Sequence, residues 1–178
     1  MNSNVFDNPK LNLIIQDGKN YVHMTDKNYD IIYSGPIHPQ SNQGSAALYT
    51  KDYFEECKSK LKKGGFQCLW LPMHMSSAED FKIIVKTFMD VYPYVSMWGL
   101  PETDTSVGHP HLIGSMDPVY PDYQVISEKL KRPGIEEDLK RLNETAFSKP
   151  YEFISQFMMG EDSLKKLVGS LTKRNTDD

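Results

Sequence analysis

The sequence predicts an α/β domain with a mostly parallel sheet and helices on its faces. Short runs rich in apolar and β-branched residues lie at residues 11–15, 29–33 and 66–71, and each is followed by a turn signal with glycine or proline. Between and after these runs, apolar residues recur at the spacing of amphipathic helices, as in residues 53–61 and 81–88. Strands that alternate with helices are typical of a parallel sheet.

Composition and charge restrict the classes of protein to consider. The 178 residues, 39% hydrophobic and 25% charged, are typical of one soluble globular domain. The net charge of −4 argues against binding to nucleic acid. The two cysteines, Cys57 and Cys68, support no disulfide framework, and we expect both to be buried, unreactive thiols. Because no signal peptide or membrane-spanning run is visible, we expect a cytoplasmic location.

Five strands are expected. Residues 11–15 are predicted to form a buried strand that runs into a turn, and residues 29–33 a second strand. Residues 66–71 are predicted as a third strand, which a proline ends. Residues 94–98 and 111–113 are expected to pair and to close the sheet.

Helix signals separate these strands. Thr50 is a good helix cap, and the pair Gly64 and Gly65 is expected to end that helix. Either Ser76 with Glu79 or Ser77 with Asp80 has the spacing of a capping box before the next helix.

The last third of the chain has a helical pattern. From about residue 123, apolar residues form three stripes: Ile135, Leu139 and Leu142; Phe153, Ile154 and Phe157; and Leu164, Leu167, Val168 and Leu171. We therefore divide the chain into a partial α/β domain at residues 1–116 and a helical C-terminal segment at residues 117–178.

Three turns follow consecutive predicted strands. They are the pair Asp17 and Gly18, residues 35–39 and residues 72–74. Because ligands of open α/β sheets bind at the carboxyl ends of the strands, these turns are expected to meet at one edge and to form a binding site.

Several stretches resemble, in the right order, motifs of the spermidine/spermine synthase family, in particular a bacterial branch of larger, often membrane-fused proteins. The stretches are residues 8–18, 29–39, 48–54, 64–72, 77–81 and 175–178. The resemblance implies a Rossmann-type, methyltransferase-like fold. It also implies transfer of an aminopropyl group from decarboxylated S-adenosylmethionine to an amine. We accordingly expect small-molecule nucleoside and amine substrates and no permanently bound cofactor.

Two features of the family are missing from this sequence. In relatives, a glycine-rich nucleotide turn and an acidic residue lie upstream of the motif that begins here at Asn8. We therefore expect an internal piece of a longer protein, whose sheet lacks its first strand–helix–strand unit. An exposed strand edge would favour a homo-oligomer, and the resemblance implies a parent protein with a membrane domain.

The resemblance places Asp17 and Gly18 against the adenine of decarboxylated S-adenosylmethionine. A carboxylate can accept a hydrogen bond from the adenine amino group, and glycine lets the backbone approach closely. The alternative is an ordinary Asp-Gly turn after a strand.

The loop after residue 34 is expected to hold the amine. In aminopropyltransferases its two carboxylates bind the polyamine and take a proton from the attacking amine, because an ammonium group has no lone pair. The corresponding positions here are Gly35 and His38, and a third acidic position corresponds to Leu71. We therefore expect impaired polyamine chemistry, with His38 as the catalytic base. The alternative for His38 is a loop histidine that caps a turn.

Other residues near the same edge have weaker signals. Trp70 and His74 are expected to line the amine pocket, although a tryptophan in a strand is more often part of the core. Tyr49 matches a family motif and could equally be a packing residue. His109 and His111 have no carboxylate or cysteine at ligand spacing, so we interpret them as structural and expect no metal site.

Three functions remain open at this point. The first is a spermidine-synthase-like transferase, impaired by the loss of its acidic residues. The second is a methyltransferase-like domain that binds a nucleoside and uses an acceptor other than a polyamine. The third is a non-catalytic fragment of a larger membrane-fused protein.

Overall fold

A computed structural model of the chain describes residues 5–35, 38–39, 43–73, 77–99, 109–135, 137, 139 and 149–177. Its elements, in chain order, are η1 (Val5–Asp7), α1 (Gly18–Met24), β1 (Tyr29–Ser34), α2 (Gln43–Ala46), η2 (Ala47–Tyr49), α3 (Lys51–Ser59), β2 (Leu61–Trp70), α4 (Ala78–Met89), β3 (Tyr94–Trp98), β4 (His111–Ser115), α5 (Tyr123–Leu130), α7 (Pro150–Ile154), β5 (Phe157–Met159) and α8 (Glu161–Val168).

The strands form one sheet in the order β1-β2-β4-β3-β5. β1 and β2 are parallel neighbours, and β4 lies antiparallel between β2 and β3. β1, β2 and β3 therefore run in the same direction, while β4 and β5 run against them. The predicted α/β class is confirmed, and β3 and β4 are the closing pair that the sequence indicated.

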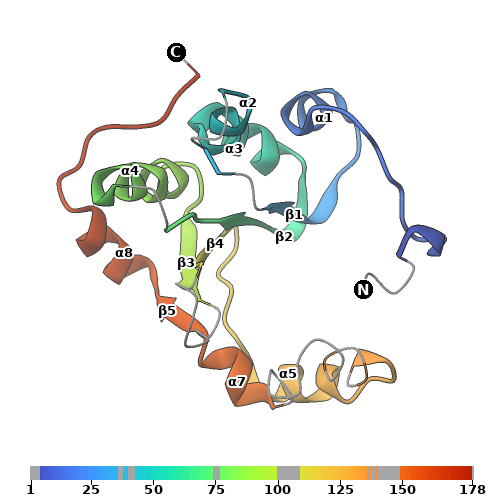
Figure 1. Ribbon diagram of the computed structural model, residues 1–178. Helices are drawn as coiled ribbons and strands as arrows, with labels where there is room; N and C mark the ends of the chain where they lie inside the picture. The colour runs from blue at the N-terminus through green and yellow to red at the C-terminus, as the bar shows by residue number, and fades with distance from the viewer. Residues whose placement is uncertain are drawn as a thin grey trace.

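Helices α3 and α4 lie on one face of the sheet, and α8 packs against α4 and β3 (Figure 1). Apolar side chains from these elements form the core; five of its fully buried members are Phe54, Leu69, Phe88, Leu112 and Leu164. α5 and α7 contact each other at the far end of the molecule (Figure 1). Burial of the apolar stripes of α3, α4 and α8 against the sheet is the main stabilising contribution.

The two predicted helix starts are confirmed. The Thr50 side chain accepts a hydrogen bond from the backbone N–H of Tyr53 at the start of α3. At the start of α4, Ser77 and Asp80 form both hydrogen bonds of a capping box. These bonds satisfy backbone donors that the first turn of a helix leaves free.

The strand predicted at residues 11–15 is wrong. These residues are assigned to no helix or strand, and their apolar side chains are exposed, with Ile15 at 91%. A strand needs a neighbour for its backbone hydrogen bonds. Within the described residues, β1 pairs only with β2, so β1 is an edge strand and no partner lies next to residues 11–15.

The glycine pair does not end α3. The helix stops at Ser59, and Gly64 and Gly65 lie inside β2. Gly64 has a φ of 74°, and a Cβ on Gly65 would lie 2.9 Å from the carbonyl oxygen of Asp30. The register between β1 and β2 shifts at this point. The two glycines therefore make an irregularity in the strand possible, where a side chain would not fit.

The C-terminal segment is not helical throughout. α7 ends at Ile154, and Phe157 belongs to β5, which pairs with β3. α8 ends before Gly169, so Leu171 lies beyond the helix, and Leu142 lies outside the described residues. β5 and α8 pack on the sheet built by earlier residues. The boundary at residues 116 and 117 stays a prediction.

Candidate functional site

The carboxyl ends of β1 and β2 lie side by side. Ser34, the last residue of β1, is in register with Leu69, so Gly35 and Trp70 each follow this last pair at the same edge of the sheet. The hydroxyl of Tyr49 donates a hydrogen bond to the backbone oxygen of Trp70 over 3.3 Å. Three of the predicted site residues, Gly35, Tyr49 and Trp70, are thus brought together at the carboxyl edge.

Tyr49 and Trp70 are largely buried at this edge, with 2% and 8% exposed. Burial raises the pKa of the Tyr49 phenol above its usual value, so the group stays neutral. The side-chain amide of Asn175 donates to the backbone oxygen of Tyr49 over 3.0 Å. Tyr49 therefore holds the end of β2 and the C-terminal tail together.

An aromatic row, made of Tyr33, Trp70, His111 and Trp98, crosses the sheet at the same edge. His111 is the cross-strand partner of both Trp70 and Trp98. Tyr33 stacks on His111 with ring centroids 5.9 Å apart and planes at 24°. Because Ser34, Gln67 and Leu112 face the helices, strand alternation puts the aromatic row on the opposite face.

His111 is a titratable member of the aromatic row whose surroundings change its protonation. Burial lowers its pKa from the usual value of 6.5, although a hydrogen bond with the backbone of His109 acts in the opposite direction. The ring is therefore neutral at physiological pH and can accept a proton or a hydrogen bond. Its Nε2 lies 3.4 Å from the hydroxyl oxygen of Tyr33.

Because Gly35 has no side chain, the ring of Tyr33 can lie next to it. A Cβ at position 35 would lie 2.3 Å from Cε1 of Tyr33. A carboxylate side chain at this position would therefore require the ring to move. The absence of a side chain at position 35 and the position of the Tyr33 ring are therefore linked.

His111, Trp98 and Tyr33 were not predicted to form one group. Each lies near the end of a strand, which was visible in the pattern. Their proximity depends on the position of β4 between β2 and β3, and no local signal predicts that order.

Asp17 and Gly18 lie at the start of α1. The Asp17 carboxylate caps this helix and accepts a hydrogen bond from the backbone N–H of Asn20 over 2.8 Å. A Cβ on Gly18 would meet no atom within 4 Å, so open space borders this residue. The ammonium group of Lys19 binds the Asp177 carboxylate at 2.6 Å, which ties the start of α1 to the C-terminal tail.

The predicted catalytic loop is partly described. His38 is half-buried, and Pro39 borders a cavity of about 410 Å³ between α2, α4 and the C-terminal tail. Asp80 is the acidic residue among those that line this cavity. Leu71 is fully buried. His74 lies outside the described residues.

In the described part of the chain, no group of three or more histidine, cysteine, aspartate or glutamate residues could hold a metal ion. Of the helices described, none combines the length and the hydropathy needed to cross a membrane.

A family model and several known proteins are similar in sequence to this chain. The family model for the spermine/spermidine synthase domain matches residues 1–101. A polyamine aminopropyltransferase of Sulfurisphaera tokodaii is 35% identical over 91 residues, which cover 51% of this chain and 30% of the relative. Polyamine aminopropyltransferase 2 of Hyperthermus butylicus is 29% identical over 113 residues, or 57% of this chain and 37% of the relative.

Solved structures are similar over more of the chain. Spermidine synthase from Thermotoga maritima superposes with a TM-score of 0.64 at 18% identity, covering 93% of this chain and 52% of that one. A spermidine synthase in complex with the transition-state analogue AdoDATO has the same TM-score and identity, with 93% and 51% covered. These likenesses show a shared methyltransferase-like fold. The chain spans about a third of the length of the curated relatives and half that of the solved structures.

Proposed function

Because this chain belongs to the spermine/spermidine synthase family, we propose that it is an aminopropyltransferase-type domain that binds an adenosyl donor and an amine at the carboxyl edge of β1 and β2. The observation that carries the proposal is the register of Ser34 with Leu69, which puts the residues after β1 and the end of β2 at one edge, next to the aromatic row. Ligands of open α/β sheets bind at such an edge. The proposed donor is decarboxylated S-adenosylmethionine, which is consumed as a co-substrate.

Each predicted residue has a role in this proposal. Asp17 would accept a hydrogen bond from the adenine amino group, and the backbone at Gly18 would lie against the nucleoside. Gly35, Tyr49, Trp70 and His74 would border the amine.

The proposed reaction needs one proton acceptor. His38 would accept a proton from the ammonium form of the amine, whose nitrogen then has a free lone pair. This lone pair attacks the propyl carbon attached to the sulfonium sulfur. A C–N bond forms, the C–S bond breaks, and the thioether nucleoside leaves with the bonding electrons.

We further propose that polyamine binding is impaired. A dicationic amine that is stripped of water needs anionic partners. Gly35, His38 and Leu71 occupy the three acidic positions that the resemblance identifies, and Leu71 is fully buried. Putrescine should therefore bind weakly. This loss favours, as the second candidate, a methyltransferase-like nucleoside-binding domain with a different acceptor.

Calorimetric titration with decarboxylated S-adenosylmethionine, S-adenosylmethionine and putrescine tests the proposal. Binding of the decarboxylated donor with weak putrescine binding is expected. Tight putrescine binding would contradict the proposed impairment. Preference for S-adenosylmethionine would favour the methyltransferase-like function, and no binding of any of the three would favour the non-catalytic fragment.

A pair of variants tests the proposed binding site for the adenosyl group. Asp17 and Asp122 cap α1 and α5 with the same type of hydrogen bond. Asn is as good a helix cap as Asp, so Asp17→Asn and Asp122→Asn should both leave the helices intact. Only Asp17→Asn should reduce donor affinity, by several-fold. If turnover is measurable, His38→Gln should abolish most of it.

We also propose a homo-oligomer. In the described part of the chain, β1 is bonded on one side only, and it carries the exposed apolar residues Ile31 and Tyr33. Free strand edges favour association. Light scattering coupled to size-exclusion chromatography tests this, with a monomer at all concentrations as the contradicting result.

A further inference from the structure

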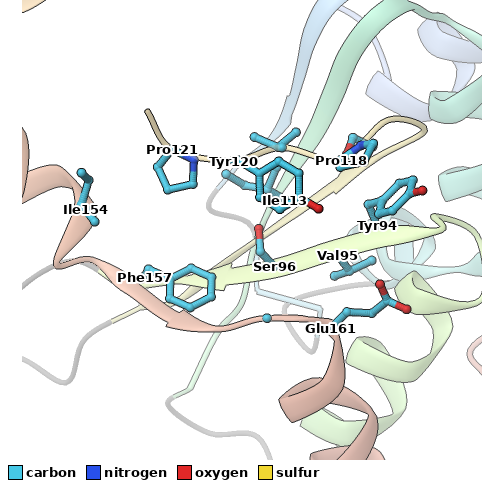
Figure 2. A pocket seen from close by; sticks show the side chains of 13 residues that line it. Tyr94, Val95, Ser96, Ile113, Pro118, Tyr120, Pro121, Ile154, Phe157 and Glu161 are labelled. Atoms are coloured by element: carbon cyan, nitrogen blue, oxygen red, sulfur yellow. The ribbon is translucent and has the colours of Figure 1, made fainter. Parts of the chain in front are cut away.

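A second cavity lies on the face of the sheet opposite α4. It has a volume of about 470 Å³ and begins at the amino end of β3, where Tyr94 and Ser115 line it. Figure 2 shows the segment after β4 on one side and the β5–α8 segment on the other, with Ser96 and Ile113 between them. The described residues around this cavity include none of those assigned to the proposed transferase site, and its size suits a small molecule.

Aromatic and apolar side chains make up most of the cavity wall. Tyr94, Tyr120 and Phe157 contribute three rings, and all three are exposed, with Tyr120 at 82%. Ile113 and Ile154 add aliphatic surface. An apolar ligand body would remove this surface from water, which is the usual source of affinity in such pockets.

The surroundings of the cavity are acidic. Among the described residues that line it, Glu161 is the charged one. The two chain segments that form most of its wall, residues 113–121 and 154–161, contain two acidic residues, Asp117 and Glu161, and no lysine or arginine. The local field therefore favours a cation and disfavours a phosphate or carboxylate.

The Glu161 carboxylate is accessible to a ligand. Its ion-pair partner is Lys165, one helical turn further along α8. The Lys165 side chain is 59% exposed and that of Glu161 is 37% exposed. Such exposed ion pairs contribute little to the stability of the fold. A ligand ammonium group can therefore replace Lys165 at a small cost in free energy.

We propose that this cavity binds a hydrophobic monoamine. The ammonium group lies on the Glu161 carboxylate, and the aryl or branched-alkyl body lies against Tyr94, Tyr120 and Phe157. Cations are also attracted to the faces of such rings. A second ammonium group would be placed against apolar walls without a partner, so the site selects against diamines. This inference does not depend on the proposed transferase function.

Titration of the full chain with three probes, followed by amide NMR shifts, tests the proposal. The probes are 2-phenylethylamine, the neutral 2-phenylethanol and the diamine putrescine. Phenylethylamine should bind most tightly, and the largest shifts should map to residues that line the cavity. In Glu161→Gln, the loss of one charge-assisted hydrogen bond should reduce the affinity for 2-phenylethylamine roughly tenfold and leave the affinity for 2-phenylethanol unchanged.

Asp162→Asn is the matched control, because it removes the same charge one residue along, at an exposed position outside the cavity. It should change the affinity for 2-phenylethylamine by less than about twofold, since salt screens the exposed charge. Equal binding of the amine and the alcohol, an unchanged affinity in Glu161→Gln, or shifts that map to another surface would each overturn the proposal.

Discussion

The ring of Tyr33 stacks on the imidazole of His111, although the two residues lie 78 positions apart in the chain. Tyr33 belongs to β1 and His111 to β4, and β2 lies between these strands. The stacked pair therefore spans three strands at the carboxyl edge. It also keeps the imidazole half-buried, which has a measurable consequence.

The stability of the fold should depend on pH through His111. Because burial holds the pKa of folded His111 below 6.5, the unfolded chain binds the proton more readily. The contribution of neutral His111 to the free energy of unfolding is complete above the pKa of the unfolded chain. It is lost as pH falls through and below about 6.5. In His111→Phe, which keeps a stacking ring, the loss of stability between pH 7 and pH 5 should be smaller. Urea unfolding at several pH values measures this, and equal pH slopes would contradict it.

A buried polar chain should make Tyr92 important for stability. Its hydroxyl donates to Oε1 of Gln67 over 2.8 Å, and the Gln67 amide donates to the Ser34 hydroxyl over 2.9 Å. Gln67 is fully buried, so Tyr92→Phe removes a partner in a site that water does not reach. We expect a loss of about 1–3 kcal/mol in the free energy of unfolding, measured with urea. Tyr123→Phe, at a 54% exposed tyrosine, should change it by less than about 0.5 kcal/mol.

Two glycines should respond in opposite ways to alanine. A Cβ on Gly114 would lie 2.5 Å from Phe88 and Tyr92, whereas a Cβ on Gly18 meets no atom within 4 Å. Gly114→Ala should therefore destabilise the fold by about 1–3 kcal/mol through overpacking. Gly18→Ala should be neutral or stabilising by up to about 1 kcal/mol. Thermal unfolding of both variants measures this, and a stable Gly114→Ala protein would show that the sheet and α4 can separate at low cost.

Gly18→Ala also tests the proposed adenosyl site. If a nucleoside lies against the backbone of Gly18, the added methyl group should weaken donor binding while stability is retained. Unchanged affinity in this variant would remove Gly18 from the site.

The thiols should react slowly in the folded protein. Burial raises the pKa of Cys57 to about 12 and that of Cys68 to about 11. The thiolate is the reactive form, so a disulfide reagent at pH 8 should label neither residue until urea unfolds the chain. Rapid labelling of one thiol without urea would show that its element opens locally.

Local signals were sufficient where neighbouring residues decide the structure. The caps at Thr50 and Ser77 and the strand that starts at Tyr29 were predicted correctly. A cap joins residues three positions apart, and a strand run has its own propensity. The order of elements and the resemblance of their motifs likewise indicated the α/β class and the family.

The errors occurred where distant contacts decide the structure. Residues 11–15 have strand composition and no partner strand within the described chain, while Phe157 has a helical pattern and pairs with β3. Gly64 and Gly65 look like a helix stop and instead allow a shift of register in β2. In each case a hydrogen-bonding partner, or its absence, outweighs the preference of the segment itself.

The candidate site residues also fall into those that local signals predict and those that distant contacts bring together. Gly35 and Trp70 could be placed together from the chain alone, because consecutive parallel strands end at one edge. The stacking of Tyr33 on His111 and the cavity next to Glu161 could not. The stacking depends on β4 inserting between β2 and β3, and the cavity depends also on β5 extending the sheet. Such pairings are selected by the packing of the whole core.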